Sequence, residues 1–168
     1  RFSPTMETVG RGRSARRGAA RLAVVLGLAA SLAACGMPRD PERTTERVEG
    51  HVLRAGVSSN PPWIRVENDR VEGVEADLIR GLAGQLHAEV RWIPGGETAL
   101  FAALKQHQLD LVAGGVTTES PWTKELGATL PFAEAGGRKH VLIAAAGENR
   151  WLLTLDRYLH DHKPAVGP

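Results

Sequence analysis

Apolar residues between positions 50 and 168 alternate between two spacings, and this alternation is the strongest constraint on the fold. Short apolar runs, continuous or with period two, predict strands over 51–58, 63–66, 89–93, 109–113 and 139–145. Apolar residues at helical spacing predict helices over 74–86, 97–106 and 148–162. Strand–helix alternation is typical of an α/β domain with a mostly parallel sheet flanked by helices. The segment is long enough for one hydrophobic core.

Three loops follow the carboxyl ends of predicted strands, where open sheets of this class bind their ligands. They comprise residues 58–63, 94–96 and 114–118. Thr117 and the backbone amides after Gly114 suit an anion or a carbonyl group, and tryptophan rings suit a flat or cationic group. The residues that we expect to bind a ligand are Ser59, Asn60, Trp63, Gly114, Gly115, Thr117 and Trp122.

Several of these features have a purely structural alternative. Gly114 and Gly115 can form a tight turn that needs positive φ without touching a ligand. The tryptophans at 63 and 122 can be core residues or anchors for a protein partner. Glu75 and Asp77 lie in the first turn of a predicted helix, where negative charge suits the helix dipole, so we interpret them as helix-start charges.

The sequence offers no catalytic or metal-binding motif that would indicate a cofactor. It has no Walker loop and no G-x-G-x-x-G, G-x-S-x-G or H-E-x-x-H pattern. The tract His160–His162 places its two histidines at i and i+2 of a predicted helix, where they point apart. We therefore expect neither a metal nor a cofactor.

The first 34 residues have the pattern of an export signal. Arginines are dense before residue 22, and Leu22–Ala34 (LAVVLGLAASLAA) is uncharged but too short to span a membrane. The end of this run together with the next residue, Leu32-Ala33-Ala34-Cys35, resembles the lipobox of bacterial lipoproteins, in which the cysteine is acylated. Cys35 is the only cysteine, so an internal disulfide is excluded. We expect a signal peptide over 1–34 and lipid attachment at Cys35.

Residues 35–49 are Pro-rich and charged, and we expect them to form a flexible tether ahead of a single lobe at 50–168. The whole chain has a net charge of +2 and a pI near 9.0. Removal of the arginine-rich segment 1–34 leaves more acidic than basic side chains. The composition therefore gives no support for nucleic-acid binding, which needs a basic surface.

Three segments together resemble one protein family. Gly56–Trp63 (GVSSNPPW) is similar to a first strand followed by a Pro-Pro-aromatic turn, and Gly73–Leu78 is similar to a G-F-D-x-D-L helix start. Leu109–Thr117, followed by Leu130–Phe132, is similar to D-A-I-x-A-G-M-T … P-Y. These motifs, in this order, resemble the family 3 extracellular solute-binding proteins, which supply ABC importers with polar amino acids and similar solutes.

The chain departs from this family in two ways. Family members have two lobes, whereas the predicted strand 139–145 runs directly into what resembles the family's last helix, so we expect the second lobe to be absent. The arginine that clamps the ligand carboxylate in the family aligns with Trp122, which cannot form the same bidentate pair. Asn60 stands where many members have an aromatic residue before Pro-Pro.

The resemblance implies a membrane-anchored extracytoplasmic protein that works with an ABC importer and binds a small polar, amino-acid-like solute without catalysis. A permease or self-association would replace the missing lobe. The protein would be lipid-anchored on the periplasmic side of a bacterial membrane, and Gly36 after the cysteine favours the outer membrane by analogy with Gram-negative lipoproteins. Alternatives are a structural or sensory lipoprotein that docks a protein partner at a decayed ligand site, or an enzyme resembling cyclohexadienyl dehydratases.

Overall fold

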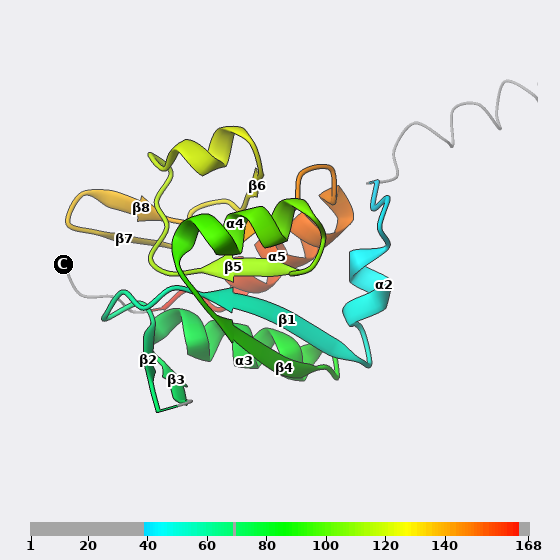
Figure 1. Ribbon diagram of the computed structural model, residues 1–168, viewed down its shortest axis with the longest axis horizontal. Helices are drawn as coiled ribbons and strands as arrows, with labels where there is room; N and C mark the ends of the chain where they lie inside the picture. The colour runs from blue at the N-terminus through cyan, green and yellow to red at the C-terminus, as the bar shows by residue number, and fades with distance from the viewer. Residues whose placement is uncertain (1–38, 69, 165–168) are drawn as a thin grey trace, which may run out of the picture. The chain divides into compact units, whose positions relative to one another are not determined.

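A computed structural model describes residues 39–68 and 70–164 (Figure 1). The predicted signal peptide and the predicted lipid attachment at Cys35 lie outside these residues. None of the helices described is long and apolar enough to cross a membrane.

The centre of the fold is a five-stranded sheet with the order β4-β1-β5-β9-β6. Strand β1 pairs in parallel with both β4 and β5, whereas β9 pairs antiparallel with β5 and β6. The sheet is therefore largely parallel around β1, as the strand–helix alternation predicts. In sheet order its strands are β4 (Glu89–Pro94), β1 (Val52–Val57), β5 (Leu111–Ala113), β9 (Ile143–Ala144) and β6 (Gly127–Ala128).

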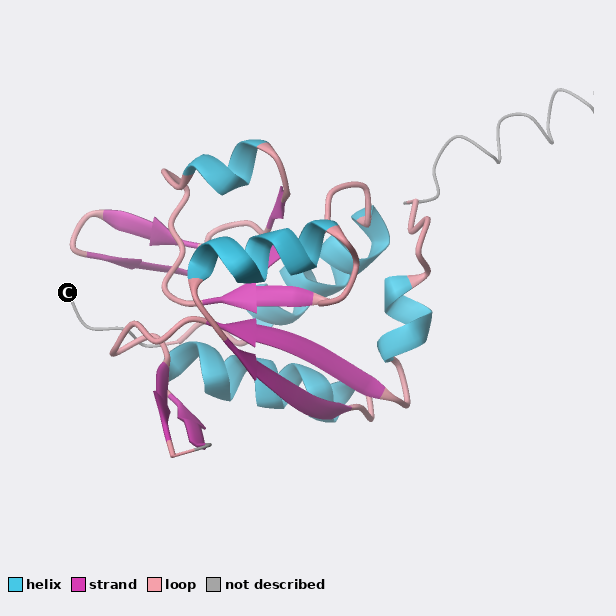
Figure 2. Cartoon of the chain, viewed as in Figure 1, coloured by secondary structure: helices cyan, strands magenta, loops and turns pink. Residues whose placement is uncertain are grey.

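Helices cover both faces of this sheet (Figure 2). Helices α3 (Val74–Gln85) and α5 (Asn149–Asp161) lie on one face, and α4 (Glu97–Lys105) lies on the other. The strands divide their side chains accordingly: Leu111 of β5 packs with the α3–α5 side, and the adjacent Val112 packs with the α4 side. This alternation follows from the period of two in a strand. The three predicted helices are confirmed to within two residues at each end.

The predicted strand 139–145 is wrong as a single element. Residues Arg138–His140 form β8, which pairs with β7 (Ala133–Ala135) in a hairpin outside the main sheet. The chain then leaves the hairpin, and β9 joins the sheet. All residues from 141 to 145 are buried, so their continuous apolar pattern carries no signal of the break.

A second hairpin follows the Pro-Pro turn. Strands β2 (Arg65–Glu67) and β3 (Arg70–Glu72) pair antiparallel, so the predicted strand 63–66 begins two residues later than expected. Trp63 and Ile64 lie in the turn instead. A short 3-10 helix (Pro121–Lys124) precedes β6.

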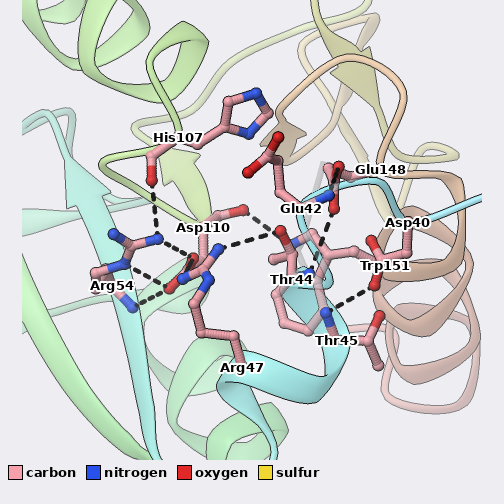
Figure 3. Close-up of polar contacts among 10 residues, drawn as sticks. All are labelled: Asp40, Glu42, Thr44, Thr45, Arg47, Arg54, His107, Asp110, Glu148 and Trp151. Atoms are coloured by element: carbon pink, nitrogen blue, oxygen red, sulfur yellow. Dashed lines mark hydrogen bonds and ion pairs between the residues drawn. The ribbon is translucent and has the colours of Figure 1, made fainter.

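The expectation of a solvated tether up to Glu49 is corrected for residues 39–49. Helix α2 (Thr44–Val48) buries both threonines and Val48 against the lobe. Glu148, which precedes α5, accepts hydrogen bonds from the backbone N–H groups of Glu42 and Thr44 at 3.0 and 3.4 Å (Figure 3). The segment therefore belongs to the folded lobe, because a partner distant in sequence satisfies its polar groups.

Candidate functional site

A hollow of about 190 Å³ opens at the carboxyl ends of β1 and β5. The parallel pairing of these strands brings the loops after Val57 and Ala113 to the same edge of the sheet. This is the position where open α/β sheets bind ligands. The lining residues with polar side chains are Ser58, Asn60, Glu97, Thr117, Ser120 and Arg138.

A larger hollow, of about 480 Å³, lies along the β2–β3 hairpin. Its lining side chains are exposed and belong to one two-stranded ribbon. The hollow at the strand ends instead gathers residues from four parts of the chain that the sheet, α4 and β8 hold in place. We therefore take the strand-end hollow as the candidate site.

The turn at Gly114 and Gly115 requires glycine. Gly115 has φ of 68°, and a Cβ there would lie 2.5 Å from Nδ2 of Asn60 and 2.8 Å from Cδ1 of Trp63. A Cβ on Gly114 would lie 2.9 Å from the carbonyl oxygen of Ser58. The Asn60 side chain also donates a hydrogen bond to the Gly114 carbonyl at 2.9 Å. Close packing alone thus explains why both positions need glycine.

The backbone amide of Gly115 is already occupied. It donates a hydrogen bond of 2.9 Å to Oε2 of Glu75, whose side chain is fully buried. Burial raises the pKa of Glu75 to about 7, against the opposing effect of the Gly115 and Gly114 amides. The interpretation of Glu75 as a simple helix-start charge is therefore corrected. The N–H of Gly115 binds an internal carboxylate, and this amide is not free for an external anion.

The two candidate tryptophans and Ser59 do not line the hollow in the part of the chain that is described. Trp63 is buried beneath Gly115, and its ring stacks on His140 with a centroid distance of 3.6 Å. Trp122 is half-buried against Phe101, at 4.8 Å between ring centroids. Ser59 is exposed, and its hydroxyl accepts a hydrogen bond from the Val66 amide. Of the predicted residues, the hollow brings together Asn60, Gly114, Gly115 and Thr117.

Arg138 and Glu97 contribute opposite charges to the hollow, and neither was predicted from the sequence. Arg138 enters it because β8 runs beside the loop after β5, where the Thr118 amide donates to the Lys139 carbonyl at 2.9 Å. Glu97 is the first residue of α4. Arg138 follows two glycines and immediately precedes the predicted strand at 139, so no motif pointed to it.

An ion cluster supports β5 from the opposite end. The buried carboxylate of Asp110 accepts hydrogen bonds from Arg47 at 2.6 Å and Arg54 at 2.7 Å, and its backbone carbonyl accepts one from the Trp151 indole at 2.8 Å (Figure 3). Asp110 directly precedes β5, which leads to Gly114. The cluster thus fixes the strand that presents the glycine turn.

Solved structures of similar shape define the fold as one lobe of a periplasmic binding protein. The arginine-bound form of domain 1 from TmArgBP has a TM-score of 0.60 and 21% identity, covering 66% of this chain and 93% of that one. The unliganded, open L-cystine solute receptor of Neisseria gonorrhoeae has a TM-score of 0.59 and 12% identity, covering 69% and 89%. At these identities the likeness shows the fold alone.

Residues 53–151 match the family model described as bacterial extracellular solute-binding proteins, family 3. The chain belongs to this family, which confirms the resemblance seen in its motifs. The family is extracytoplasmic and supports a solute-binding role.

Curated relatives include the membrane-bound lytic murein transglycosylase F of Idiomarina loihiensis, 33% identical over 106 residues, or 62% of this chain and 23% of the relative. The protein of the same name from Vibrio cholerae serotype O1 is 29% identical over 96 residues, or 56% of this chain and 18% of the relative. The matched region thus spans less than a quarter of the length of these relatives.

Proposed function

We propose that this chain is a membrane-anchored, extracytoplasmic lobe that binds a small zwitterionic, amino-acid-like solute at the strand-end hollow, without catalysis. The single observation that carries this proposal is that two opposite charges, Arg138 and Glu97, line a hollow that Thr117 also lines. A free amino acid presents one carboxylate and one ammonium group, so it complements both charges at once.

Arg138 is the residue that would bind the solute carboxylate. A guanidinium group can donate two parallel hydrogen bonds to a carboxylate. Trp122 stands where the family arginine is expected, and Arg138 from β8 would supply that charge from a different element. The hydroxyl of Thr117 can add a further hydrogen bond, while Glu97 can accept from the ammonium group.

A single open lobe binds more weakly than two lobes that close on a ligand, because less of the solute is removed from water. The arginine-bound domain 1 from TmArgBP supports the possibility of binding by one lobe. We expect dissociation constants of roughly 10 µM to 1 mM, equivalent to about 4–7 kcal/mol. An ABC permease or a second copy of the chain would cover the open face, and Cys35 would carry the lipid anchor.

Isothermal titration calorimetry on the full chain in mild detergent tests this proposal, with L-arginine, L-glutamine and L-cystine as probes. We expect Arg138→Ala to weaken binding about tenfold, or about 1.4 kcal/mol. The matched control is Arg91→Ala, which removes an exposed arginine on β4 outside the hollow. Absence of binding by all three probes at several millimolar, or equal binding by both variants, would contradict the proposal.

The transglycosylase relatives favour a second candidate function, in which the lobe is a sensory module that docks a cell-wall enzyme. In that case a protein partner would cover the strand-end face. Crosslinking in membranes distinguishes the two: a partner that is lost on Trp122→Ala, together with no binding of the amino-acid probes, would support the sensory candidate. Turnover of prephenate by the chain would instead indicate a dehydratase-like enzyme.

A further inference from the structure

Two buried titratable side chains lie beneath the glycine turn of the hollow. Glu75 comes from α3 and is fully buried, whereas His140 comes from β8 and is 4% exposed. Oε2 of Glu75 accepts the Gly115 amide, but Oε1 has no hydrogen-bond partner among the described residues. Nδ1 of His140 also lacks a partner there. Such groups are rare in folded proteins and call for an explanation.

The local backbone directs Glu75 inward. Gly73 has φ of 117°, and a Cβ there would lie 2.5 Å from the Trp63 carbonyl oxygen. This close approach lets the Glu75 amide donate to the same carbonyl at 3.0 Å. Glu75 therefore connects the Pro-Pro turn, the start of α3 and the glycine turn of the hollow.

The bond from Gly115 to Glu75 depends on the charge of the carboxylate. An ionised carboxylate accepts a hydrogen bond about twice as strongly as a neutral group. Because burial raises the pKa of Glu75 to about 7, both forms of the side chain are populated near neutral pH. The carboxylate that holds the turn thus changes charge in the physiological range.

The other titratable groups near Glu75 differ from it in burial or in the direction in which their pKa is shifted. On β8, burial and the charge of Arg138 lower the pKa of His140, against the opposing effect of a hydrogen bond with the Gly115 backbone. On β3, Glu72 is exposed, and on α3 itself Asp77 is exposed and pairs with Arg80. Glu75 is the group among these whose carboxylate accepts the Gly115 amide of the glycine turn.

We propose that Glu75 is a positioning residue of the hollow, which acts through Gly115 to hold the glycine turn in its ligand-accepting form and weakens that hold on taking up a proton. The solute part of this inference rests on the proposed function. Solute affinity then falls as the pH drops from 8.5 to 5.5, roughly three- to tenfold for the loss of one charge-assisted bond. The charges of a free amino acid do not change over most of this interval, so the protein is the source of the effect.

Two measurements on the full chain in detergent test this proposal. The first follows the ¹⁵N–¹H resonance of the Gly115 amide from pH 5.5 to 8.5. We expect it to titrate in the wild type and in Glu72→Gln, an exposed control with the same chemical change, but not in Glu75→Gln. The second measures the affinity for L-arginine over the same range, and we expect its pH dependence to disappear only in Glu75→Gln.

The outcomes separate this inference from the proposed function. A Gly115 resonance that does not move with pH, or that still titrates in Glu75→Gln, overturns the role of Glu75. A titrating resonance with pH-independent L-arginine affinity also overturns it. If none of the amino-acid probes binds while Gly115 titrates through Glu75, the hold on the turn is supported and the proposed function fails.

Discussion

Replacement of Asp110 by asparagine is the sharpest test of how the lobe is held together. The Asp110 side chain is fully buried, and its two oxygens accept from the side chains of Arg47 and Arg54 and from the Arg54 backbone amide at 2.7 Å. Asparagine keeps the shape and one acceptor oxygen. It removes the negative charge and turns an N–H₂ group toward cationic donors.

The expected loss follows from burial and exposure. Removing one partner of a buried ion pair costs about 3–5 kcal/mol, because the other charge is left unpaired. Here the Arg54 and Arg47 side chains keep 26% and 36% of their surface exposed, so water can hydrate the unpaired guanidinium groups and offset part of this loss. We expect Asp110→Asn to lower the free energy of unfolding by about 2–3 kcal/mol. For a domain of this size the melting temperature falls by about 6–12 °C.

Urea unfolding followed by far-UV circular dichroism at pH 7.5 measures the change. The matched control is Asp77→Asn, which removes an exposed carboxylate paired with Arg80, and we expect it to change stability by less than about 0.5 kcal/mol. A double-mutant cycle of Asp110→Asn with Arg47→Ala should show a coupling of about 1 kcal/mol. Equal effects of the two asparagine variants, or zero coupling, would refute the reasoning.

Two further predictions concern the glycine turn and the N-terminal helix. Gly115→Ala should destabilise the lobe by about 2 kcal/mol or more, because this position has positive φ and close contacts. The control Gly84→Ala, with open space around it, should stabilise helix α3 by up to about 0.5 kcal/mol. Melting curves of both variants check this. Burial and the nearby Asp40 carboxyl raise the pKa of Glu148, so its contribution to stability is present at low pH and is lost as the pH rises through its folded pKa. The wild-type urea midpoint should therefore fall as the pH rises from 4 to 8, and this pH dependence should weaken in Glu148→Gln. An unchanged pH dependence in the variant would contradict the role of Glu148.

Helices and parallel strands were predictable because their signals are local. The apolar spacing of 74–86 marks α3, since Ala76, Ile79 and Leu82 face the core with a helical period. Strands β1, β4 and β5 lie close to the predicted ranges for the same reason. The glycine turn could also be placed, because it follows directly from the end of β5.

The remaining features depend on partners far away in sequence. Residues 39–49 resemble a tether by composition, but distant residues provide hydrogen bonds and ion pairs that hold them. Glu148 accepts two of their backbone amides, Asp110 pairs with Arg47, and Arg150 pairs with Glu46. Arg138 belongs to the hollow because β8 runs beside residues 116–118, which no periodicity encodes. Glu75 looked like a surface helix start, and its burial is set by the Trp63 carbonyl and the Gly115 amide.

The position of α2 has a consequence for the order of folding. A helix of five residues is far too short to be stable alone. The amides of its first residue, Thr44, and of Glu42 just before it donate to Glu148, 104 and 106 positions further along the chain. Contacts of such high sequence separation form only after the intervening chain has been closed into a compact unit. The first described helix to be synthesised is therefore among the last to form, because a growing chain cannot make these hydrogen bonds until Glu148 has been made.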